Sequence, residues 1–590
     1  MDHQNPIVID DEDDFSDTSS ITLDNDPDRL YFLREGSQAT TPVLSLSEDV
    51  IDLTQNEGVD DGDYVTDDVL GILLEEWHIS QTAARPSPQL ELPREKPLEQ
   101  VCGADGIVFM PGQSVEIHDD TYLRICFIWQ DTDGEIFLQG RRLRRLRRRA
   151  SDFECVNGAY LPQWRNELVW KVHEAEMVPL GFVRRFVSIR FTNYCHVKTD
   201  HKKDANSKDL FCRLKENIQE CSNSVQYLTY NEADVDFRIK PDILRRRWRG
   251  ETARFGSKKE DELFIILDKT GESQQPDSKS QHKYTFGDGF CGVGGVSCGA
   301  ELAGLHIKWA FDRCPKAAST YRINFGAAAC DTSDVFNFLT SEEDFLKVDV
   351  THGSPPCQTW SRVKTIPCAN DDANSACIFS GGDIVRRARS RVHTMEETSG
   401  LIEGHEEYFC GVIRDFLETG YSVRWAILNC VEYGVPQLRK RLVVIASGPG
   451  ENLPAMPRPT HGPPDSGLRN FSTINQTISA IPPGANDHDV EAAKRRFVRR
   501  CFVKKRPFDG NQQARTITCN GGNNYHPSGQ RGFTTREYAS LQTFPLDFQF
   551  RENARPQIGN AVPPVFARAI YEEVIRSLQE TDECEMREDR

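Results

Sequence analysis

The feature that constrains this chain most is a series of short apolar runs between residues 284 and 447 that alternate with helical stretches. Each run has the length of a strand, and the intervening stretches are long enough for crossover helices. This alternation predicts an α/β fold with a doubly wound, mostly parallel sheet. The expected strands are Tyr284–Phe286, Ile307–Phe311, Phe345–Thr351, Val392–Met395, Val423–Leu428 and Leu442–Ala446.

The first expected strand ends in a glycine-rich turn, Asp288–Gly295, where the backbone can bend tightly and approach a ligand. Asp312 follows the second strand, where its carboxylate would accept hydrogen bonds from ribose hydroxyls. Asp331 follows the next helix and would receive an adenine amino group. Polar groups at the ends of successive strands predict an adenosine-containing cofactor. From the turn itself, the expected cofactor-binding residues are Phe290, Gly292, Gly294 and Gly295.

The segment Gly353–Ser361 reads Gly-Ser-Pro-Pro-Cys-Gln-Thr-Trp-Ser and follows the fourth expected strand. Here the chain resembles the DNA (cytosine-5)-methyltransferases, in which Pro-Pro-Cys-Gln at this place carries the nucleophile; we call Gly353–Ser361 the nucleophile loop. The resemblance continues in order through blocks at Met395–Thr398, Gln437–Arg441, Arg536–Pro545 and Gln557–Pro564.

The resemblance implies a methyltransferase with a Rossmann-like fold that uses S-adenosyl-L-methionine. It also implies that Cys357 is the nucleophile that adds to cytosine C6. Glu396 would stabilise the charge that develops on the ring, and Arg439 and Arg441 would supply a positive field. The target base must leave the DNA stack, and the segment 362–392 would close over it. By the same resemblance, Pro355, Asn560 and Val562 would contact the cofactor, and Gln358, Ser361 and Gln437 would contact DNA.

The sequence departs from the common pattern of that family after the catalytic glutamate. Most relatives have Asn-Val there, and the Asn braces the nucleophile loop, whereas this chain has Glu397 and Thr398. A carboxylate cannot donate those hydrogen bonds unless it is protonated. Glu-Glu-Thr or Glu-Gln-Thr at this place is the variant found in the fungal RID family, which is linked to premeiotic silencing of repeated DNA. In this segment the chain therefore resembles that family. The departure leaves two alternatives, an active methyltransferase and a weak or inactive DNA-binding silencing factor.

A third alternative is an RNA cytosine methyltransferase of the same fold. The transfer-RNA branch usually has Pro-Phe-Thr after its Pro-Pro-Cys-Gln, whereas this chain has Thr359-Trp360-Ser361. That difference favours double-stranded DNA as the substrate.

A small target-recognition region is expected at residues 448–533, so we predict weak intrinsic sequence specificity. A basic run in this region suits contacts with DNA phosphates; a solvated helix face is the alternative. The predicted contacts are Lys494, Arg495, Arg499, Lys504 and Arg506.

The formal charge of the chain is −19, but the acidic residues gather at its ends. Residues 1–100 therefore predict a disordered acidic arm. In it, Ile7–Asp10 and Val50–Thr54 resemble motifs that bind SUMO-modified proteins by adding a strand. The basic run Arg141–Arg149 predicts nuclear import and nonspecific DNA contact, with pairing to the acidic arm as the alternative.

Residues 101–250 alternate apolar and polar positions and resemble a BAH domain, a module that serves chromatin contacts; an unrelated β-rich domain is the alternative. The strongest local signal is a hairpin that joins Tyr122–Trp129 to Glu135–Leu138. A linker at 251–283 would lead to the catalytic domain at 284–447 and 534–580, with an acidic tail at 581–590.

The 18 cysteines show no zinc-site spacing, so we expect reduced thiols and no metal. No run of apolar residues is long enough to cross a bilayer, so we expect no membrane partner. Together with the basic run, these features predict a nuclear protein.

Overall fold

The computed structural model describes residues 96–103, 106–145, 166–172, 177–195, 210–219, 222–250, 284–326, 329–356, 360, 376–500, 507–519, 525–551 and 553–588. The predicted SUMO-binding segments and the predicted linker lie outside these residues. Within them, no helix is both long enough and apolar enough to cross a membrane. In the same part of the chain, no group of three or more His, Cys, Asp or Glu residues is placed to hold a metal ion.

A seven-stranded sheet forms the centre of the C-terminal half, in the order β15-β14-β13-β16-β17-β20-β18. Neighbouring strands are parallel except at β20, which runs antiparallel to both β17 and β18. The predicted mostly parallel sheet is therefore confirmed. Its strands are β13 (Thr285–Gly289), β14 (His306–Phe311), β15 (Ala329–Asp331), β16 (Val350–Gly353), β17 (Val392–Thr398), β18 (Ser422–Asn429) and β20 (Lys440–Ser447).

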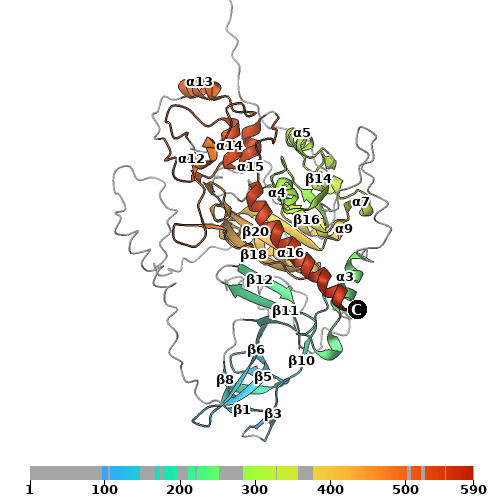
Figure 1. Cartoon of the computed structure of the whole chain (residues 1–590). Helices are drawn as coiled ribbons and strands as arrows, with labels where there is room; N and C mark the ends of the chain where they lie inside the picture. The colour runs from blue at the N-terminus through green and yellow to red at the C-terminus, as the bar shows by residue number, and fades with distance from the viewer. Residues whose placement is uncertain are drawn as a thin grey trace, which may run out of the picture. The chain divides into compact units, whose positions relative to one another are not determined.

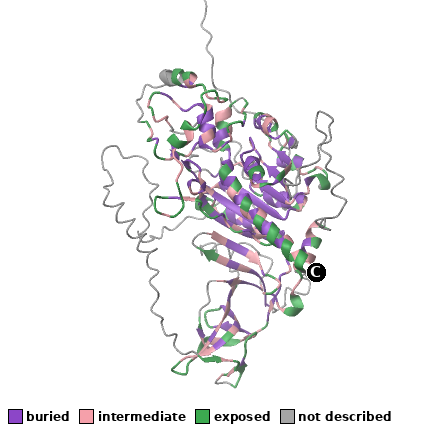
Figure 2. Ribbon diagram, in the orientation of Figure 1, coloured by how far each residue is buried: buried purple, intermediate pink, exposed green. Residues whose placement is uncertain are grey.

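Helices cover both faces of this sheet. On one face, α4 (Gly295–Ala303) and the long α16 (Pro564–Glu588) enclose an apolar cluster that includes Phe286 and Ile445. On the other face, α9 (Ser380–Ala388) and α11 (Glu406–Glu418) pack on Met395 and Val444. Figure 1 shows α16 crossing in front of the strands, and Figure 2 shows the strands buried while the outer side of α16 is exposed. Burial on both faces explains the continuous apolar run of β20.

In the C-terminal half, two boundaries differ from the prediction. The run Phe345–Thr351 is not one strand, because residues Glu343–Leu346 form the short helix α7 and the strand begins only at Val350. The predicted acidic tail at 581–590 is, up to Glu588, the end of α16. Its Asp582 accepts a hydrogen bond from the Tyr284 hydroxyl at 2.7 Å, so its acidic residues help fix the helix on the sheet.

The N-terminal half is rich in β structure, as predicted. Its hairpin joins β5 to β6 across a turn in which Gly134 has φ 84°. The predicted arm ends earlier than residue 100, because β1 pairs with β5. The elements are β1 (Lys96–Leu98), β2 (Val101–Cys102), β3 (Val108–Phe109), β4 (Ser114–Ile117), β5 (Tyr122–Gln130), β6 (Ile136–Arg145), β7 (Glu167–Lys171), β8 (Val178–Pro179), β9 (Val183–Val187), β10 (Ile189–Phe191), β11 (Leu210–Gln219), β12 (Ser222–Tyr227) and α3 (Pro241–Arg249).

The described part of the basic run at 141–149 belongs to strand β6, and burial along it runs from the buried Arg142 and Leu143 to the exposed Arg145. Leu143 is fully buried, Arg142 pairs with Asp119, and Arg145 donates to the Tyr122 hydroxyl at 2.8 Å. Arg141 lies over the Trp170 ring and donates to a backbone carbonyl. Arg141, Arg142 and Arg145 therefore contact other groups of the same domain, and the nuclear import and nonspecific DNA contact expected of the run stay predictions.

The N-terminal domain joins the catalytic sheet directly. Strand β12 pairs antiparallel with β18, with Ser224 opposite Arg424. Helix α3 then packs Trp248 edge-on against Tyr421, with the ring centroids 5.6 Å apart. The two domains therefore share hydrogen-bonded strands as well as an apolar contact.

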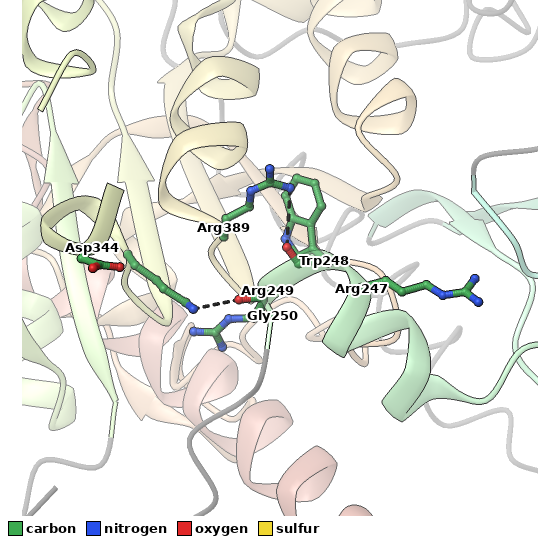
Figure 3. A pocket seen from close by; sticks show the side chains of 7 residues that line it. Arg247, Trp248, Arg249, Gly250, Asp344 and Arg389 are labelled. Atoms are coloured by element: carbon green, nitrogen blue, oxygen red, sulfur yellow. Dashed lines mark hydrogen bonds between the residues drawn. The ribbon is translucent and has the colours of Figure 1, made fainter. Parts of the chain in front are cut away.

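A cavity of about 260 Å³ lies beside the end of α3. Basic side chains that line the cavity contact the C-terminal end of α3 (Figure 3). Lys347 donates to the Arg249 carbonyl at 2.7 Å, and Arg389 lies over the Trp248 ring. Arg249 itself pairs with Asp349 at 3.2 Å.

The remaining elements of the C-terminal half include short helices that pack on the sheet, such as α6 against Trp309 and Phe311. Helix α14 begins with a capping box between Thr534 and Glu537, which satisfies backbone N–H groups at its first turn. These elements are α5 (Pro315–Asn324), α6 (Val335–Phe338), α10 (Gly400–Gly404), β19 (Gln437–Leu438), β21 (His461–Gly462), β22 (Arg469–Asn470), α12 (Ile474–Ser479), α13 (Val490–Arg500), β23 (Ala514–Arg515), α14 (Thr535–Leu541) and α15 (Ala554–Asn560).

Candidate functional site

Four parallel strands end side by side at one edge of the catalytic sheet. Gly289 is in register with Phe311 and with Gly353, and Phe311 is in register with Asp331. We call this row the carboxyl edge. Because the glycine turn, Asp312, Asp331 and the nucleophile loop each occupy or follow a member of the row, the structure brings the predicted groups to one place, where α/β sheets bind ligands.

The glycine turn separates into an open part and a packed part. Phe290 and Gly292 have positive φ values of 57° and 55°, and the space beside Gly292 is empty. A Cβ on Gly294 would lie 2.3 Å from the Phe325 ring, and one on Gly295 would lie 2.3 Å from the Val562 carbonyl oxygen. Gly292 therefore faces the space that a cofactor would use, whereas Gly294 and Gly295, predicted as cofactor contacts, let other parts of the protein approach closely.

Asp312 is fixed by the backbone on both sides. One carboxylate oxygen accepts from the Gly292 N–H and the other from the Cys314 N–H, each at 2.8 Å. Burial raises the pKa of Asp312, although these hydrogen bonds oppose the shift. Asp331 is exposed at the end of β15. The two acidic side chains therefore keep oxygen atoms at the edge, as an adenosine ligand requires.

Asp288 is a buried carboxyl that the sequence reasoning did not select, although it begins the glycine-turn motif. One of its oxygens accepts from the Ser297 hydroxyl at 2.5 Å, and Ser297 also contacts the Tyr321 hydroxyl at 2.8 Å. Among the described residues its other oxygen has no hydrogen-bond partner. Burial raises the pKa of Asp288 to about 7. A strand-end acid in such a motif was the only available signal.

The nucleophile loop begins against the glycine turn. The Ser354 N–H donates to the Gly289 carbonyl at 3.3 Å, and Pro355 is buried. Cys357, Gln358 and Ser361 lie outside the described residues, so their predicted roles stay predictions. At the far end of the loop, Trp360 is buried against Tyr408 of α11.

Glu396 and Arg441 form an ion pair on neighbouring strands. Glu396 lies opposite Val443 and Arg441 lies opposite Thr398, so the two are diagonal neighbours on one face of an antiparallel pair. The Arg441 Nε atom is 2.6 Å from Glu396 Oε1, and both side chains are about seven-eighths buried. The arrangement holds the Glu396 carboxyl in one orientation beside a permanent cation.

Glu397 points to the opposite face, because side chains alternate along a strand. It is 1% exposed. One oxygen accepts from the Thr398 N–H at 2.9 Å, and the other has no hydrogen-bond partner among the described residues. Burial, and then the charge of Glu396, raise the pKa of Glu397 well above its ordinary value. Burial therefore favours the protonated form of this carboxyl, which carries a hydrogen that it can donate.

Arg439 and Gln437 are buried structural side chains. Arg439 donates to the carbonyls of Ile517, Gly559 and Ala561 at 3.1 to 3.3 Å, and so ties the end of the target-recognition region to α15. Gln437 is fully buried and accepts from the Ile517 N–H while it donates to the Leu541 carbonyl. Gln437 thus offers no surface to DNA, which corrects that prediction, and the contacts of Arg439 indicate a positioning role.

The two predicted cofactor residues of the C-terminal block differ in exposure. Val562 is 5% exposed and belongs to the apolar core, where its carbonyl meets Gly295. The Asn560 side chain is exposed at the end of α15, and its oxygen accepts from the Cys519 thiol at 2.7 Å. Only Asn560 offers its side chain to a ligand, so Val562 contributes packing.

The basic run of the target-recognition region begins on helix α13. Lys494 is about half exposed and pairs with Glu491 at 2.8 Å, and Arg495 is exposed. The side chains of Arg499, Lys504 and Arg506 lie outside the described part. The described charges are thus on the surface, where contact with phosphate is sterically open.

Comparison with known proteins identifies the same half of the chain. The profile of the family described as "C-5 cytosine-specific DNA methylase" matches residues 284–507 and 486–576. A type II methyltransferase of Haemophilus parahaemolyticus, M1.HphI, is 29% identical over 50% of this chain and 87% of its own length. M.NgoFVII of Neisseria gonorrhoeae is 29% identical over 47% of this chain and 82% of its own length. M.AplI of Arthrospira platensis is 31% identical over 50% of this chain and 86% of its own length.

Proposed function

The chain belongs to the C-5 cytosine-specific DNA methylase family, and from this premise we propose that Cys357, Glu396 and Arg441 carry methyl transfer to cytosine C5 in double-stranded DNA. The observation that supports the proposal most directly is the ion pair between Glu396 of β17 and Arg441 of β20. Strand β17 lies next to β16, the strand that leads into the nucleophile loop. A carboxyl and a cation in fixed geometry are the groups that charge development on a pyrimidine ring requires.

The enzymes of this family use S-adenosyl-L-methionine, which supplies an electrophilic methyl group on a sulfonium sulfur. The residues at the carboxyl edge fit this molecule. Gly292 borders open space. The proposal assigns the hydrogen bonds with the adenosine to the carboxyl groups of Asp312, beside Gly292, and of Asp331, which is exposed. Phe290, Pro355 and Asn560 complete the proposed binding set.

In the proposed reaction, the Cys357 thiolate adds to C6 of the cytosine and makes C5 nucleophilic. The carboxyl of Glu396 donates a proton to N3 as negative charge moves there, and Arg441 keeps that carboxyl oriented. After the methyl group has been transferred, a base or a water molecule takes the C5 proton and Cys357 departs by β-elimination. Because C5 and C6 are stacked in a duplex, the target base is first rotated out of the helix, at a cost of a few kcal/mol.

DNA affinity in this proposal comes mainly from phosphate contacts through Lys494, Arg495, Arg499, Lys504 and Arg506, together with contacts from Gln358 and Ser361. We also assign the enzyme to a RID-like role in silencing repeated DNA in a fungal nucleus. The Glu397-Thr398 variant supports this assignment, as does the β-rich N-terminal domain, to which we assign chromatin contacts. SUMO-modified partners would bind the motifs proposed in the acidic arm. The burial of Glu397 supports an active enzyme, because a protonated carboxyl can donate where an Asn would.

Bisulfite mapping of duplex DNA incubated with the purified protein and methyl donor tests the activity, with Cys357→Ala as the matched control. We expect 5-methylcytosine only with the unaltered chain. Equal methylation by Cys357→Ala would contradict the assignment of the nucleophile.

Trapping on DNA that contains 5-fluorocytosine separates an active enzyme from an inactive silencing factor. The proposed mechanism predicts a stable covalent adduct, because fluorine blocks release of the C5 substituent. Absence of the adduct would favour the inactive alternative. Adduct formation on transfer RNA in preference to duplex DNA would favour the RNA alternative.

A further inference from the structure

Four polar side chains, three of them buried, form a continuous series of contacts from helix α16 to the start of the nucleophile loop. The Tyr571 hydroxyl is 3.0 Å from the Thr394 hydroxyl, which is 2.8 Å from Nδ1 of His352. Nε2 of His352 is 2.6 Å from the Ser354 hydroxyl. Ser354 stands three positions before Cys357 in the sequence. The chain of contacts therefore ends on the segment that carries the proposed nucleophile.

The middle of this chain is closed to solvent. His352, Thr394 and Tyr571 are each 3% exposed or less. Water cannot replace a lost partner at such positions, so a broken contact leaves an unsatisfied polar group. This series of hydrogen bonds therefore has a strongly preferred arrangement, and a single substitution within it should change the position of the Ser354 side chain.

The protonation state of His352 suits a connector. Burial, and then repulsion from His393, lower the pKa of His352 to about 3. The imidazole is neutral at physiological pH, with one ring nitrogen as donor and the other as acceptor. In one tautomer Ser354 donates to Nε2, and in the other it accepts from Nε2–H. Either tautomer holds the Ser354 side chain in the same place.

The residues of this hydrogen-bond series stand on paired strands and on a helix packed against the sheet. His352 and Thr394 are directly opposite each other on the paired strands β16 and β17. Tyr571 packs edge-on against Phe286, with the ring centroids 5.1 Å apart. Thr394 also lies two residues before Glu396, so the two project from the same face of β17. The same strand thus fixes both Glu396 and the anchor of the nucleophile loop.

We propose that His352 is a positioning residue, which sets the nucleophile loop relative to Glu396 by holding Ser354 through a neutral imidazole anchored on Thr394 and Tyr571. This inference rests on the proposed function of Cys357. It assigns His352 no contact with substrate. A displaced loop would slow attack on C6 without changing the groups that bind the methyl donor.

Two substitutions at His352 distinguish the contact made by Nε2 from the contact made by Nδ1. A Gln side chain places a polar atom near the position of Nε2, so His352→Gln keeps the contact with Ser354. An Asn side chain reaches only the position of Nδ1, so His352→Asn keeps Thr394 and loses Ser354. His393→Asn is the matched control, because His393 is equally buried on β17 and bonds Thr351 at 2.9 Å rather than Ser354.

The measurement is the rate of adduct formation on duplex DNA that contains 5-fluorocytosine, together with KM for S-adenosyl-L-methionine. We expect His352→Asn to form the adduct about 10- to 100-fold more slowly, with an unchanged KM, the range found for groups that orient a catalytic residue. We expect His352→Gln to stay within about threefold of the unaltered chain, and His393→Asn to match it.

The outcomes are distinguishable. If the unaltered chain forms no adduct, the proposed function itself fails. If it does, an unaltered rate for His352→Asn, or equal losses for His352→Asn and His352→Gln, would overturn the positioning role. Ser354→Ala removes the same contact without emptying the core, so it replaces His352→Asn if that variant does not fold. A rate for Ser354→Ala equal to that of the unaltered chain would likewise overturn the inference.

Discussion

Two adjacent glutamates on β17 occupy opposite faces of the sheet and have opposite surroundings. Glu396 lies on the α16 face and meets the Arg441 guanidinium at 2.6 Å. Glu397 lies on the α11 face, beside Met395 and Leu442, and no cation pairs with it among the described residues. One residue step along a strand thus separates a carboxyl paired with a cation from a carboxyl whose pKa burial raises. The two side chains should therefore affect different measurable properties.

The largest effect should follow from Glu396→Gln. This change keeps the shape of the side chain but removes the charge that faces Arg441. We expect kcat for 5-methylcytosine formation to fall by about 10²- to 10⁴-fold, the range for a positioned acid or base. The measurement is steady-state methylation of duplex DNA, with Glu397→Gln as the matched control. Similar losses for the two variants would break the contrast between the faces.

A smaller effect is expected from Arg441→Lys. Lysine keeps the positive charge but lacks the planar guanidinium that fixes the Glu396 carboxyl. We expect kcat/KM to fall about tenfold and the melting temperature to change little, because both side chains retain some access to solvent. Methylation assays and thermal melts on the same preparation test this. An unchanged kcat/KM would show that charge alone is sufficient and that orientation is not required.

The smallest effect on rate should come from Glu397→Gln, which instead changes stability. The folded-state pKa of Glu397 is raised, so the folded protein binds a proton that the unfolded chain releases above about pH 4.3. Its contribution to stability is thus present below that pH and is lost as the pH rises, by up to about 1.4 kcal/mol per pH unit, until the folded-state pKa is passed.

Glutamine has no proton to lose, so Glu397→Gln should melt at a higher temperature than the unaltered chain at pH 7 to 8. The difference should shrink toward pH 4.5. Thermal melts of both proteins across this range measure it. A difference that does not vary with pH would mean that Glu397 is ionised in the folded state.

The sequence predicted the main elements of the fold because they depend on local patterns. The β/α alternation predicted the strands around Ile307–Phe311 and Leu442–Ala446, and the structure confirms both. The same reasoning was wrong for Phe345–Thr351, since an apolar run alone does not distinguish a strand from a short helical turn followed by a strand. The contacts of the basic run at 141–145 could not be predicted from its composition, because strand pairing alternates its side chains between core and surface.

For the site, the sequence by itself determined which chemical groups the chain carries and in what order. The glycine turn, the Pro-Pro-Cys-Gln segment and the later blocks indicate the family without coordinates, because motif spacing is a property of the chain. Only the tertiary structure decided what each side chain faces. It placed Gln437 and Arg439 inside the protein, paired Glu396 with Arg441, and left Glu397 among apolar neighbours. The physical reason is that burial and pKa depend on groups distant in sequence, which become neighbours only when the strands pair and the helices cover them.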